Sequence, residues 1–149
     1  MTSPYLMDDL KGDEGLRLAA YPDPLSGGDP WTIGYGHTGP EVHQGLVWTE
    51  DQCADALAKD IARACRLLDL NAPWWRDMND DRQDVLASMV FNMGWSGVLQ
   101  FHHTLAAMQA GDWQAAHDGM LNSKWARQVG ARAQRLAQQM LTGVHAQRS

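Results

Sequence analysis

The stretch DEGLRLAAYPDPLSGGDPWTIGYGH, residues 13–37, decides the fold and carries the candidate chemistry. Within it Glu14, Asp23 and Thr32 follow one another at intervals of nine residues. Apolar and aromatic residues alternate on both sides of a turn rich in Pro, Gly, Asp and Ser, which predicts two strands joined by a long loop. The two glycines of the TIGYGH segment allow a close backbone approach or a positive φ. We expect this hairpin to hold two carboxylates and a hydroxyl around one small volume of solvent.

A helix is predicted over residues 4–13, immediately before the hairpin. Ser3 at the N-cap and Pro4 at the first helical position are typical of a helix start. Glycines bracket Asp13 and Glu14, so the helix is expected to end there. The macrodipole disfavours a negative charge at a helix C-terminus, so a Glu14 carboxyl without a cationic partner is expected to favour its protonated form. That protonated form is the one that a general acid needs.

Everything after the hairpin predicts helices. Thr49 to Gln52 match a capping box, and the helix that follows is expected to run to about Leu70. One apolar stripe marks this helix: Cys53, Leu57, Ile61, Ala64 and Leu68. Later helical segments are expected in this order: from the Asn79/Asp80 cap to Gly94, a short piece over 95–101, 104–110, 113–121 behind Asp112, a turn around Trp125, and 130–142.

These elements predict an α+β fold, with a small hairpin lobe and a larger helical lobe joined by a long helix. We expect a single domain over residues 1–149. The hairpin lobe spans about 15–48, the bridging helix about 50–70, and the helical lobe 1–14 plus 71–149.

Composition excludes several classes of protein. With 44% apolar and 20% charged residues in 149, the chain is an ordinary globular domain with enough length for a core. The net charge of −6 disfavours a nucleic-acid partner, although no acidic residue follows Asp118 and the basic residues there could orient an anionic polymer. No apolar run is long enough for a membrane span, and the polar, acidic N-terminus does not resemble a signal peptide. We therefore expect synthesis in a cytoplasm and no stable membrane insertion.

The two cysteines are expected to be buried, free and structural. Cys53 and Cys65 lie about 18 Å apart on one predicted helix, beyond the roughly 7 Å that a disulfide allows. The histidines show no metal-ligand spacing with Cys or Glu, so no metal and no cofactor is predicted.

Glu14 and Asp23 are candidates for paired-carboxylate chemistry. Cleavage of an acetal needs one carboxyl to protonate the leaving oxygen and another to act on the opposite face. Taken alone the pair is weak evidence, because a surface ion pair or a turn-capping Asp is the commoner role for either. Thr32 could hold a water against Asp23 or simply be a β-branched strand residue, and His37 is more often a hydrogen-bonded structural histidine. The tryptophans of the helical part, Trp74, Trp75, Trp95, Trp113 and Trp125, are expected mostly in the core.

The motifs together resemble the phage-type lysozymes of glycoside hydrolase family 24, most of all the T-even type. Glu14 in DEGLRL, Asp23 in YPD and Thr32 in WTIGYGH match in order. VFNMGWSGVLQF (90–101), GDWQAA (111–116) and NSKWARQVGARAQR (122–135) continue the resemblance over nearly the whole chain.

The resemblance implies a lysozyme-like fold and hydrolysis of the β-1,4 bond between N-acetylmuramic acid and N-acetylglucosamine in peptidoglycan. Glu14 is implied as general acid, with Asp23 as second carboxylate and Thr32 helping to place the attacking water. The T-even type implies inversion, for which carboxyl separations of roughly 6.5–9.5 Å are typical. Implied substrate contacts are Thr38, Phe91, Asn92, Thr104 and Arg132.

The chain departs from the T-even pattern at three places. Its hairpin loop is about three residues longer, Thr38 replaces an apolar residue, and Gly119 replaces a polar one. The implied role is that of a monomeric endolysin, made in the host cytoplasm and released to the wall through a holin-type lesion. Two alternatives remain: a lytic transglycosylase, which has no use for a water-positioning pair, and a peptidoglycan-binding module without catalysis.

Overall fold

The computed structural model of the chain describes residues 1–148, which form two compact units. One unit comprises Met7–Arg63, and the other comprises Met1–Leu6 with the described residues from Ala64 onward. The described residues form seven α-helices, one 3₁₀-helix and a three-stranded sheet, so the predicted α+β class is confirmed. Residues 7–14, assigned from the sequence to the helical lobe, group here with the strands.

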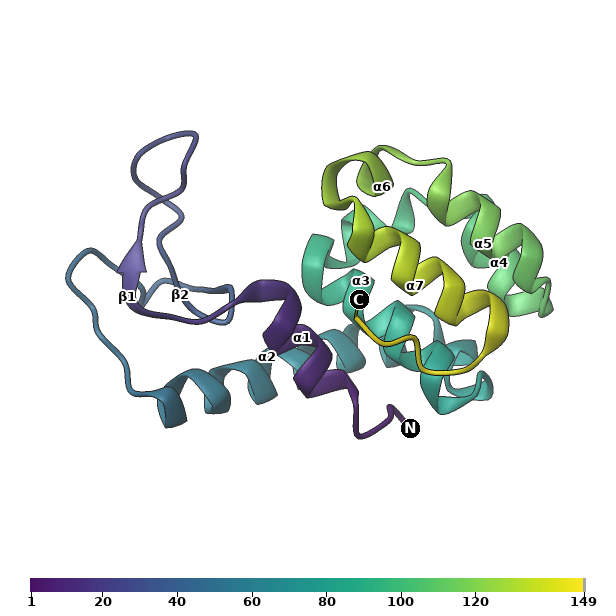
Figure 1. Cartoon of the computed structure of the whole chain (residues 1–149), viewed down its shortest axis with the longest axis horizontal. Coiled ribbons are helices and arrows are strands. Elements are labelled where there is room, and N and C mark those ends of the chain that lie inside the picture. The colour runs from purple at the N-terminus through teal and green to yellow at the C-terminus, as the bar shows by residue number, and fades with distance from the viewer. Residues whose placement is uncertain (149) are drawn as a thin grey trace. The chain divides into compact units, whose positions relative to one another are not determined.

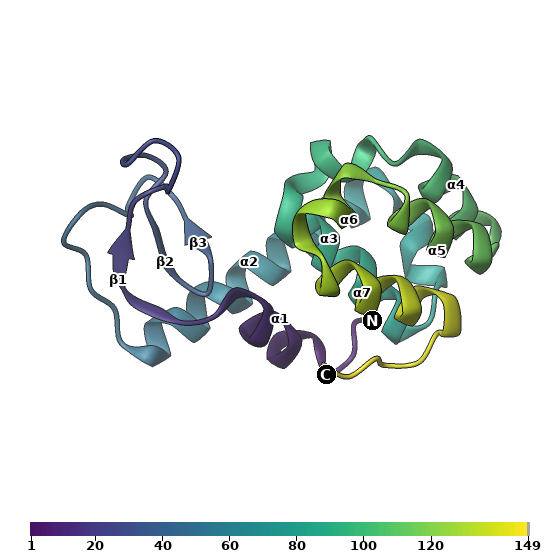
Figure 2. The ribbon, with the colours of Figure 1, turned by 45° about the horizontal axis from the view of Figure 1, so that its top comes forward.

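The strand unit contains most of α1 (Leu6–Glu14) and an antiparallel sheet in the order β1-β2-β3, seen in Figure 2. Its strands are β1 (Arg17–Tyr21), β2 (Thr32–Gly34) and β3 (His37–Thr38). The sequence predicted β1 and β2 but not β3, because a two-residue strand shows no alternation. Helix α1 also begins later than predicted: Ser3 Oγ does accept a hydrogen bond from the Tyr5 N–H at 3.1 Å, but residues 4 and 5 form a turn.

Helix α2 (Glu50–Asn71) starts at the predicted capping box. The Thr49 N–H donates to Gln52 Oε1 at 2.8 Å, and the Gln52 N–H donates to Thr49 Oγ1 at 3.2 Å. This reciprocal pair satisfies two helix-end donors, which fixes the N-terminus of α2. Of the predicted stripe, four residues are buried and Ile61 is partly exposed.

Both cysteines are free. Cys53 is buried as expected, whereas Cys65 is only partly buried. Burial raises the pKa of both thiols, which keeps them protonated and unreactive near neutral pH.

The helical unit is drawn in teal to yellow in Figure 1. After η1 (Pro73–Asp77) come α3 (Asp80–Leu99), α4 (His102–Ala110), α5 (Trp113–Leu121), α6 (Lys124–Val129) and α7 (Ala131–Thr142). The predicted caps Asn79 and Asp112 each accept a hydrogen bond from a first-turn N–H. Ser123 does the same for α6, a short helix where the sequence predicted only a turn around Trp125. Gly94, predicted to end a helix, has the non-helical angles φ 74° and ψ 166°, so α3 consists of two helical pieces that meet in a kink at this residue.

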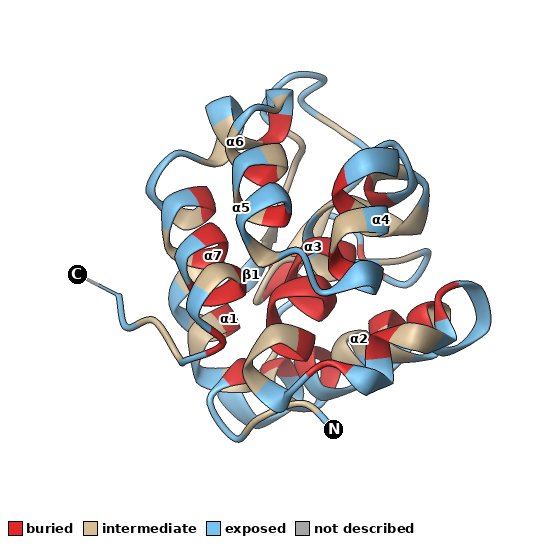
Figure 3. Ribbon diagram, turned by 90° about the vertical axis from the view of Figure 1, so that its right-hand side faces the viewer, coloured by how far each residue is buried: buried red, intermediate tan, exposed pale blue. Residues whose placement is uncertain are grey.

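Helix α3 runs through the core of the helical unit. Residues 83–90 are all buried, and Figure 3 shows buried residues through α3 and along one side of α5 and α7. Such a helix, buried on every side, is held by its neighbours rather than by an amphipathic face. Among the tryptophans predicted for the core, Trp75 and Trp125 are buried, while Trp74, Trp95 and Trp113 are partly exposed.

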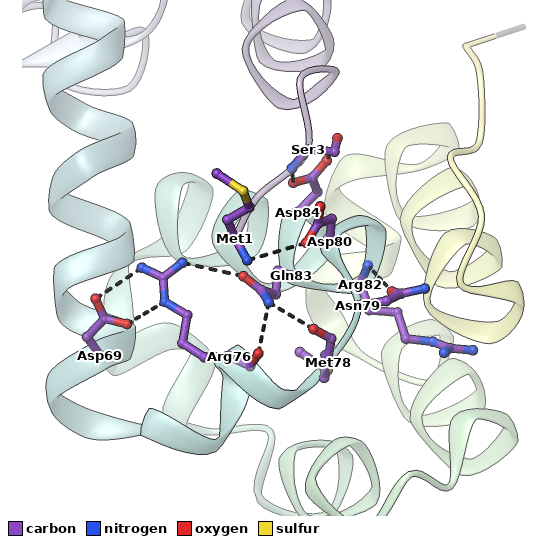
Figure 4. A network of polar contacts seen from close by, with 10 residues as sticks. All are labelled: Met1, Ser3, Asp69, Arg76, Met78, Asn79, Asp80, Arg82, Gln83 and Asp84. Carbon is purple, nitrogen blue, oxygen red and sulfur yellow. Dashed lines mark hydrogen bonds and ion pairs between the residues drawn. The ribbon is translucent and has the colours of Figure 1, made fainter.

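Polar groups at the start of α3 are satisfied by a network within the helical unit (Figure 4). Asp84 accepts hydrogen bonds from the N–H of Ser3, at 2.7 Å, and from its hydroxyl. The Gln83 amide donates to the carbonyls of Arg76 and Met78 at 3.1 and 2.8 Å. These contacts meet the requirement that buried polar groups be hydrogen-bonded, and they tie residues 1–6 to α3.

Along residues 1–148 no helix combines the length and the apolar character needed to cross a membrane.

Candidate functional site

Glu14 lies where α1 ends and is half-buried. Gly15 follows with φ +71° and donates from its N–H to the Lys11 carbonyl at 3.0 Å, which closes the helix in a left-handed cap. The Glu14 carboxyl lies directly against Gly36. A Cβ added at Gly36 would lie 2.7 Å from Glu14 Oε2 and 3.2 Å from its Cδ. The turn before β3 therefore forms a wall for this carboxyl, and a side chain at Gly36 would force the carboxyl to shift.

Asp23 lies just beyond β1, in the long loop, and is half-buried. Its carboxylate Oδ2 accepts a hydrogen bond from the Ser26 N–H at 3.0 Å. Its own N–H donates to the Gly28 carbonyl at 2.9 Å, and its carbonyl accepts from the Gly27 N–H at 2.8 Å. Within residues 1–148 no donor bonds to the other carboxylate oxygen, Oδ1, which is thus available to water or substrate.

Ser26 fixes the rest of this loop. Its hydroxyl donates to the Asp29 carbonyl at 2.9 Å and accepts from the Gly28 N–H at 3.2 Å. The loop is therefore built around Asp23 by main-chain contacts, as expected for Asp and Ser in a glycine-rich turn.

Thr32 opens β2 and lies in a row of side chains across the sheet. It is opposite Tyr21 of β1 and opposite Thr38 of β3. Directly opposed residues project from the same face, so the three side chains are neighbours. The Arg17 guanidinium lies over the Tyr21 ring, 4.5 Å from its centroid. Tyr21 is the last residue of β1, and Asp23 follows it by two residues. Thr32 and Thr38 therefore lie beside the end of β1 from which the Asp23 loop starts.

His37, next to Gly36, is buried between two carboxylates. Its Nδ1 lies 2.7 Å from Asp60 Oδ2 of α2, and its Nε2 lies 2.6 Å from Glu41 Oε1. Burial alone would lower the pKa of His37, but the hydrogen bonds and charges of Glu41 and Asp60 outweigh it and raise the pKa above the ordinary 6.5. His37 therefore matches the structural, hydrogen-bonded reading of the sequence.

The other four predicted residues belong to the helical unit. Phe91 and Asn92 lie on α3, Thr104 in the first turn of α4, and Arg132 in the first turn of α7. Asn92 is exposed, and its Oδ1 accepts a hydrogen bond from the indole N–H of buried Trp125 at 2.8 Å. Phe91 and Arg132 are half-buried.

A pocket of about 610 Å³ lies in the helical unit. Thr104 is the one predicted contact among its lining residues. The Phe101 and Trp125 rings form part of its wall and meet edge to face, with centroids 6.2 Å apart. Glu14, Asp23, Thr32 and Thr38 thus all belong to the strand unit, whereas Thr104 lines a pocket of the helical unit.

Two features of these sites lie beyond what the sequence alone could indicate. The glycines of TIGYGH suggested a close approach or a positive φ, and both have positive φ, but the partner of Gly36 could not be named from spacing. The pocket depends on how four consecutive helices, α3 to α6, pack together, so only its Thr104 was expected at a site, through the family resemblance.

Comparison with known proteins gives one family. The family model described as phage lysozyme matches residues 11–143. The chain is 33% identical to the pre-baseplate central spike protein Gp5 of Enterobacteria phage T4, over 90% of this chain and 27% of that protein. It is 32% identical to an endolysin of Acyrthosiphon pisum secondary endosymbiont phage 1, over 79% of this chain and 75% of the endolysin. A probable T4-type lysozyme 1 of Dictyostelium discoideum is 26% identical, over 93% and 94% of the two chains.

Proposed function

The chain belongs to the phage lysozyme family of glycoside hydrolases, and from that premise we propose that it is an endolysin that cleaves the glycan of bacterial peptidoglycan. The bond is the β-1,4 linkage between N-acetylmuramic acid and N-acetylglucosamine. Glu14 is the general acid, and Asp23 with Thr32 handles the attacking water.

The observation that carries this proposal is the placement of Glu14. The carboxyl lies at the C-terminus of α1 and against Gly36. A carboxyl in its protonated form can give its proton to the glycosidic oxygen as the bond to C1 breaks. The oxygen leaves as a sugar hydroxyl, and Glu14 becomes a carboxylate.

Asp23 is suited to the opposite role. One oxygen is held by the Ser26 N–H, so the carboxylate is oriented while its Oδ1 can accept a hydrogen bond from water. The negative charge would stabilise the oxocarbenium-like transition state, and Asp23 takes the proton of the water that attacks C1. The Thr32 hydroxyl is the second group that can hold this water. Exchange with solvent then restores both carboxyls.

The remaining predicted residues are proposed as substrate contacts. Thr38 continues the row from Thr32 on the sheet, and Thr104 lines the pocket. Phe91, Asn92 and Arg132 complete the set. Asn92 contributes through Trp125, because its hydrogen bond fixes the indole of a pocket residue.

The test is digestion of purified peptidoglycan, with the products resolved by mass spectrometry. Wild type should release fragments with a reducing-end muramic acid, and Glu14→Gln should lower the rate by at least about 10³-fold, as expected when a positioned acid is lost. Asp55→Asn, which removes an exposed carboxyl of α2, is the matched control and should retain full activity.

Other products would point to the alternatives. Fragments with 1,6-anhydro ends, with Asp23→Asn still active, would identify a lytic transglycosylase. Binding to peptidoglycan without any cleavage by wild type would leave only a binding module.

The similarity to a spike protein supports a second biological role for the same glycan cleavage, as one region of a phage spike rather than as an endolysin. The spike match covers 90% of this chain but about a quarter of the spike, so the chain is similar to one region of a longer protein. Expression of the chain in a bacterial cytoplasm distinguishes the endolysin role from the spike-like role. An endolysin should lyse the cell when a holin is co-expressed and not otherwise; failure to lyse by a catalytically active chain would favour the spike-like setting.

A further inference from the structure

The turn between β2 and β3 is held at both of its ends by α2. Gly34 ends β2 with φ +68°, and a Cβ added there would lie 3.2 Å from both Cβ and Sγ of Cys53. His37 opens β3, and its Nδ1 lies 2.7 Å from Asp60 Oδ2. Cys53 and Asp60 both belong to α2, so this helix fixes the residues on either side of the turn.

The two residues inside the turn contact α1. Gly36 lies against the Glu14 carboxyl. The ring of Tyr35, a half-buried residue, lies under the ammonium of Lys11, with Lys11 Nζ 5.7 Å from the ring centroid. This distance is within the roughly 6 Å over which a cation and an aromatic face attract each other.

Both contacts join the same two segments. Lys11 and Glu14 are three residues apart on α1, a spacing that puts their side chains on one face of the helix. Tyr35 and Gly36 are neighbours in the turn. A movement of the turn at Tyr35 would therefore also move the wall that Gly36 presents to the Glu14 carboxyl.

Tyr35 is the side chain by which α1 can hold this turn. It stands between Gly34 and Gly36, which have no side chains and both have positive φ. Lys11 has a choice of partners, because Asp8 also lies three residues away on α1 and could form an ion pair at that spacing. Its ammonium is nevertheless directed to the Tyr35 ring.

We propose that Lys11 and Tyr35 are positioning residues for the general acid. Their cation–π contact holds the glycine-flanked turn against α1, and the turn keeps the Glu14 carboxyl where it can reach the glycosidic oxygen. Neither side chain takes part in the reaction. The inference rests on the proposed role of Glu14, because the contact acts through the placement of that carboxyl.

The test is steady-state kinetics on soluble peptidoglycan fragments. Lys11→Met removes the charge and keeps the chain length, and Tyr35→Leu removes the aromatic face and keeps an apolar side chain. Each should lower kcat about tenfold and leave KM within about twofold, because a displaced acid weakens transition-state stabilisation rather than substrate binding. The double variant should also lose about tenfold, and not about a hundredfold, since both changes break one contact.

Conservative changes should preserve the activity. Lys11→Arg keeps a cation and Tyr35→Phe keeps the aromatic face, so each should retain kcat within about twofold of wild type. Two matched controls should leave kcat and KM unchanged: Lys59→Gln, at an exposed lysine of α2, and Tyr5→Leu, which removes a ring stacked on His145 of the helical unit. Urea unfolding of every variant gives the folded fraction under the assay conditions, which should equal that of wild type.

Several results would overturn the inference. A raised KM in Tyr35→Leu with an unaffected Lys11→Met would show that the ring binds substrate. A loss of kcat in proportion to unfolded protein, or an additive loss in the double variant, would show that the pair does not position Glu14. Unchanged kcat in both single variants would overturn the positioning role alone. Absence of glycan cleavage by wild type would overturn the proposed function, and the positioning role with it.

Discussion

The buried ion pair between His37 and Asp60 makes the stability of the strand unit depend on pH. The two side chains are 11% and 14% exposed, and their atoms are 2.7 Å apart. The second partner, Glu41, is 54% exposed. Removing one member of a buried pair costs about 3–5 kcal/mol when the remaining charge has no other partner, and the lower end applies here because Glu41 stays against the other ring nitrogen of His37. Asp60→Asn keeps a hydrogen-bonding amide, so we expect about 3 kcal/mol near pH 5.5, which lowers the melting temperature by roughly 6–12 °C for a chain of this length.

Glu41→Gln is the matched comparison at the other nitrogen of the same ring. Its carboxylate is largely solvated, so the expected cost is below about 1 kcal/mol. Arg63 is a further charged group at this cluster; its Nη2 lies 3.9 Å from Asp60 Oδ1, and its side chain is mostly exposed. It contributes little, since the interaction is long and screened by water.

The sign of the pH dependence follows from the raised pKa of His37. A histidine with a higher pKa in the folded state adds stability that is fully present below the unfolded pKa of about 6.5 and is lost as pH rises through the folded pKa. Urea unfolding of wild type, Asp60→Asn and Glu41→Gln at pH 5.5 and at about pH 9 measures it. The cost of Asp60→Asn should shrink at the higher pH. An equal cost at both values, or an equal cost for both variants, would refute the reasoning.

Three further predictions concern single contacts. Gly36→Ala should lower kcat on peptidoglycan by about 10²-fold or more, because the new Cβ would lie 2.7 Å from Glu14 Oε2 and displace the carboxyl; unchanged kcat in a folded variant would exclude this role. Asn92→Ala should cost about 1–3 kcal/mol in urea unfolding, since it leaves the indole N–H of buried Trp125 without its partner, whereas Asn122→Ala, at an exposed position, should cost less. Thr49→Ala removes half of the capping box of α2 and should cost about 1 kcal/mol; no loss of stability would show that this helix end does not depend on its cap.

Much of the helical fold could be predicted from local chemistry. Asn79, Thr49, Asp112 and Ser123 mark helix starts because their side chains accept main-chain hydrogen bonds within three residues. Gly111 and Gly143 mark helix ends through their left-handed φ. Such signals are contained in a few consecutive residues, so they can be read from the sequence.

Features that depend on distant residues could not be predicted in the same way. Strand β3 has only two residues and exists because it pairs with β2, not because of its own pattern. Cys65 lies on α2 beside the predicted stripe but near enough to its edge to remain partly exposed.

The candidate site shows the same division. Glu14, Asp23 and Thr32 became candidates through their motif, since for the two carboxylates spacing alone favoured a surface ion pair or a turn cap. The contact of Glu14 with Gly36 requires α1 and the turn before β3 to be folded together. The pocket around Thr104 requires four helices. Both are tertiary features, and no pattern of adjacent residues encodes them.

The most direct test of the central claim is the anomeric configuration of the first product. Peptidoglycan fragments cleaved by wild type in ¹⁸O-labelled water would be followed by NMR at early times, before mutarotation, and by mass spectrometry. If Asp23 and Thr32 direct water to the face opposite the leaving group, the new reducing end should carry the label and appear first as the α-anomer, with Asp23→Asn and Thr32→Val each slowing its formation. A first product with the β configuration, or an unlabelled anhydro end, would contradict the roles proposed for Asp23 and Thr32.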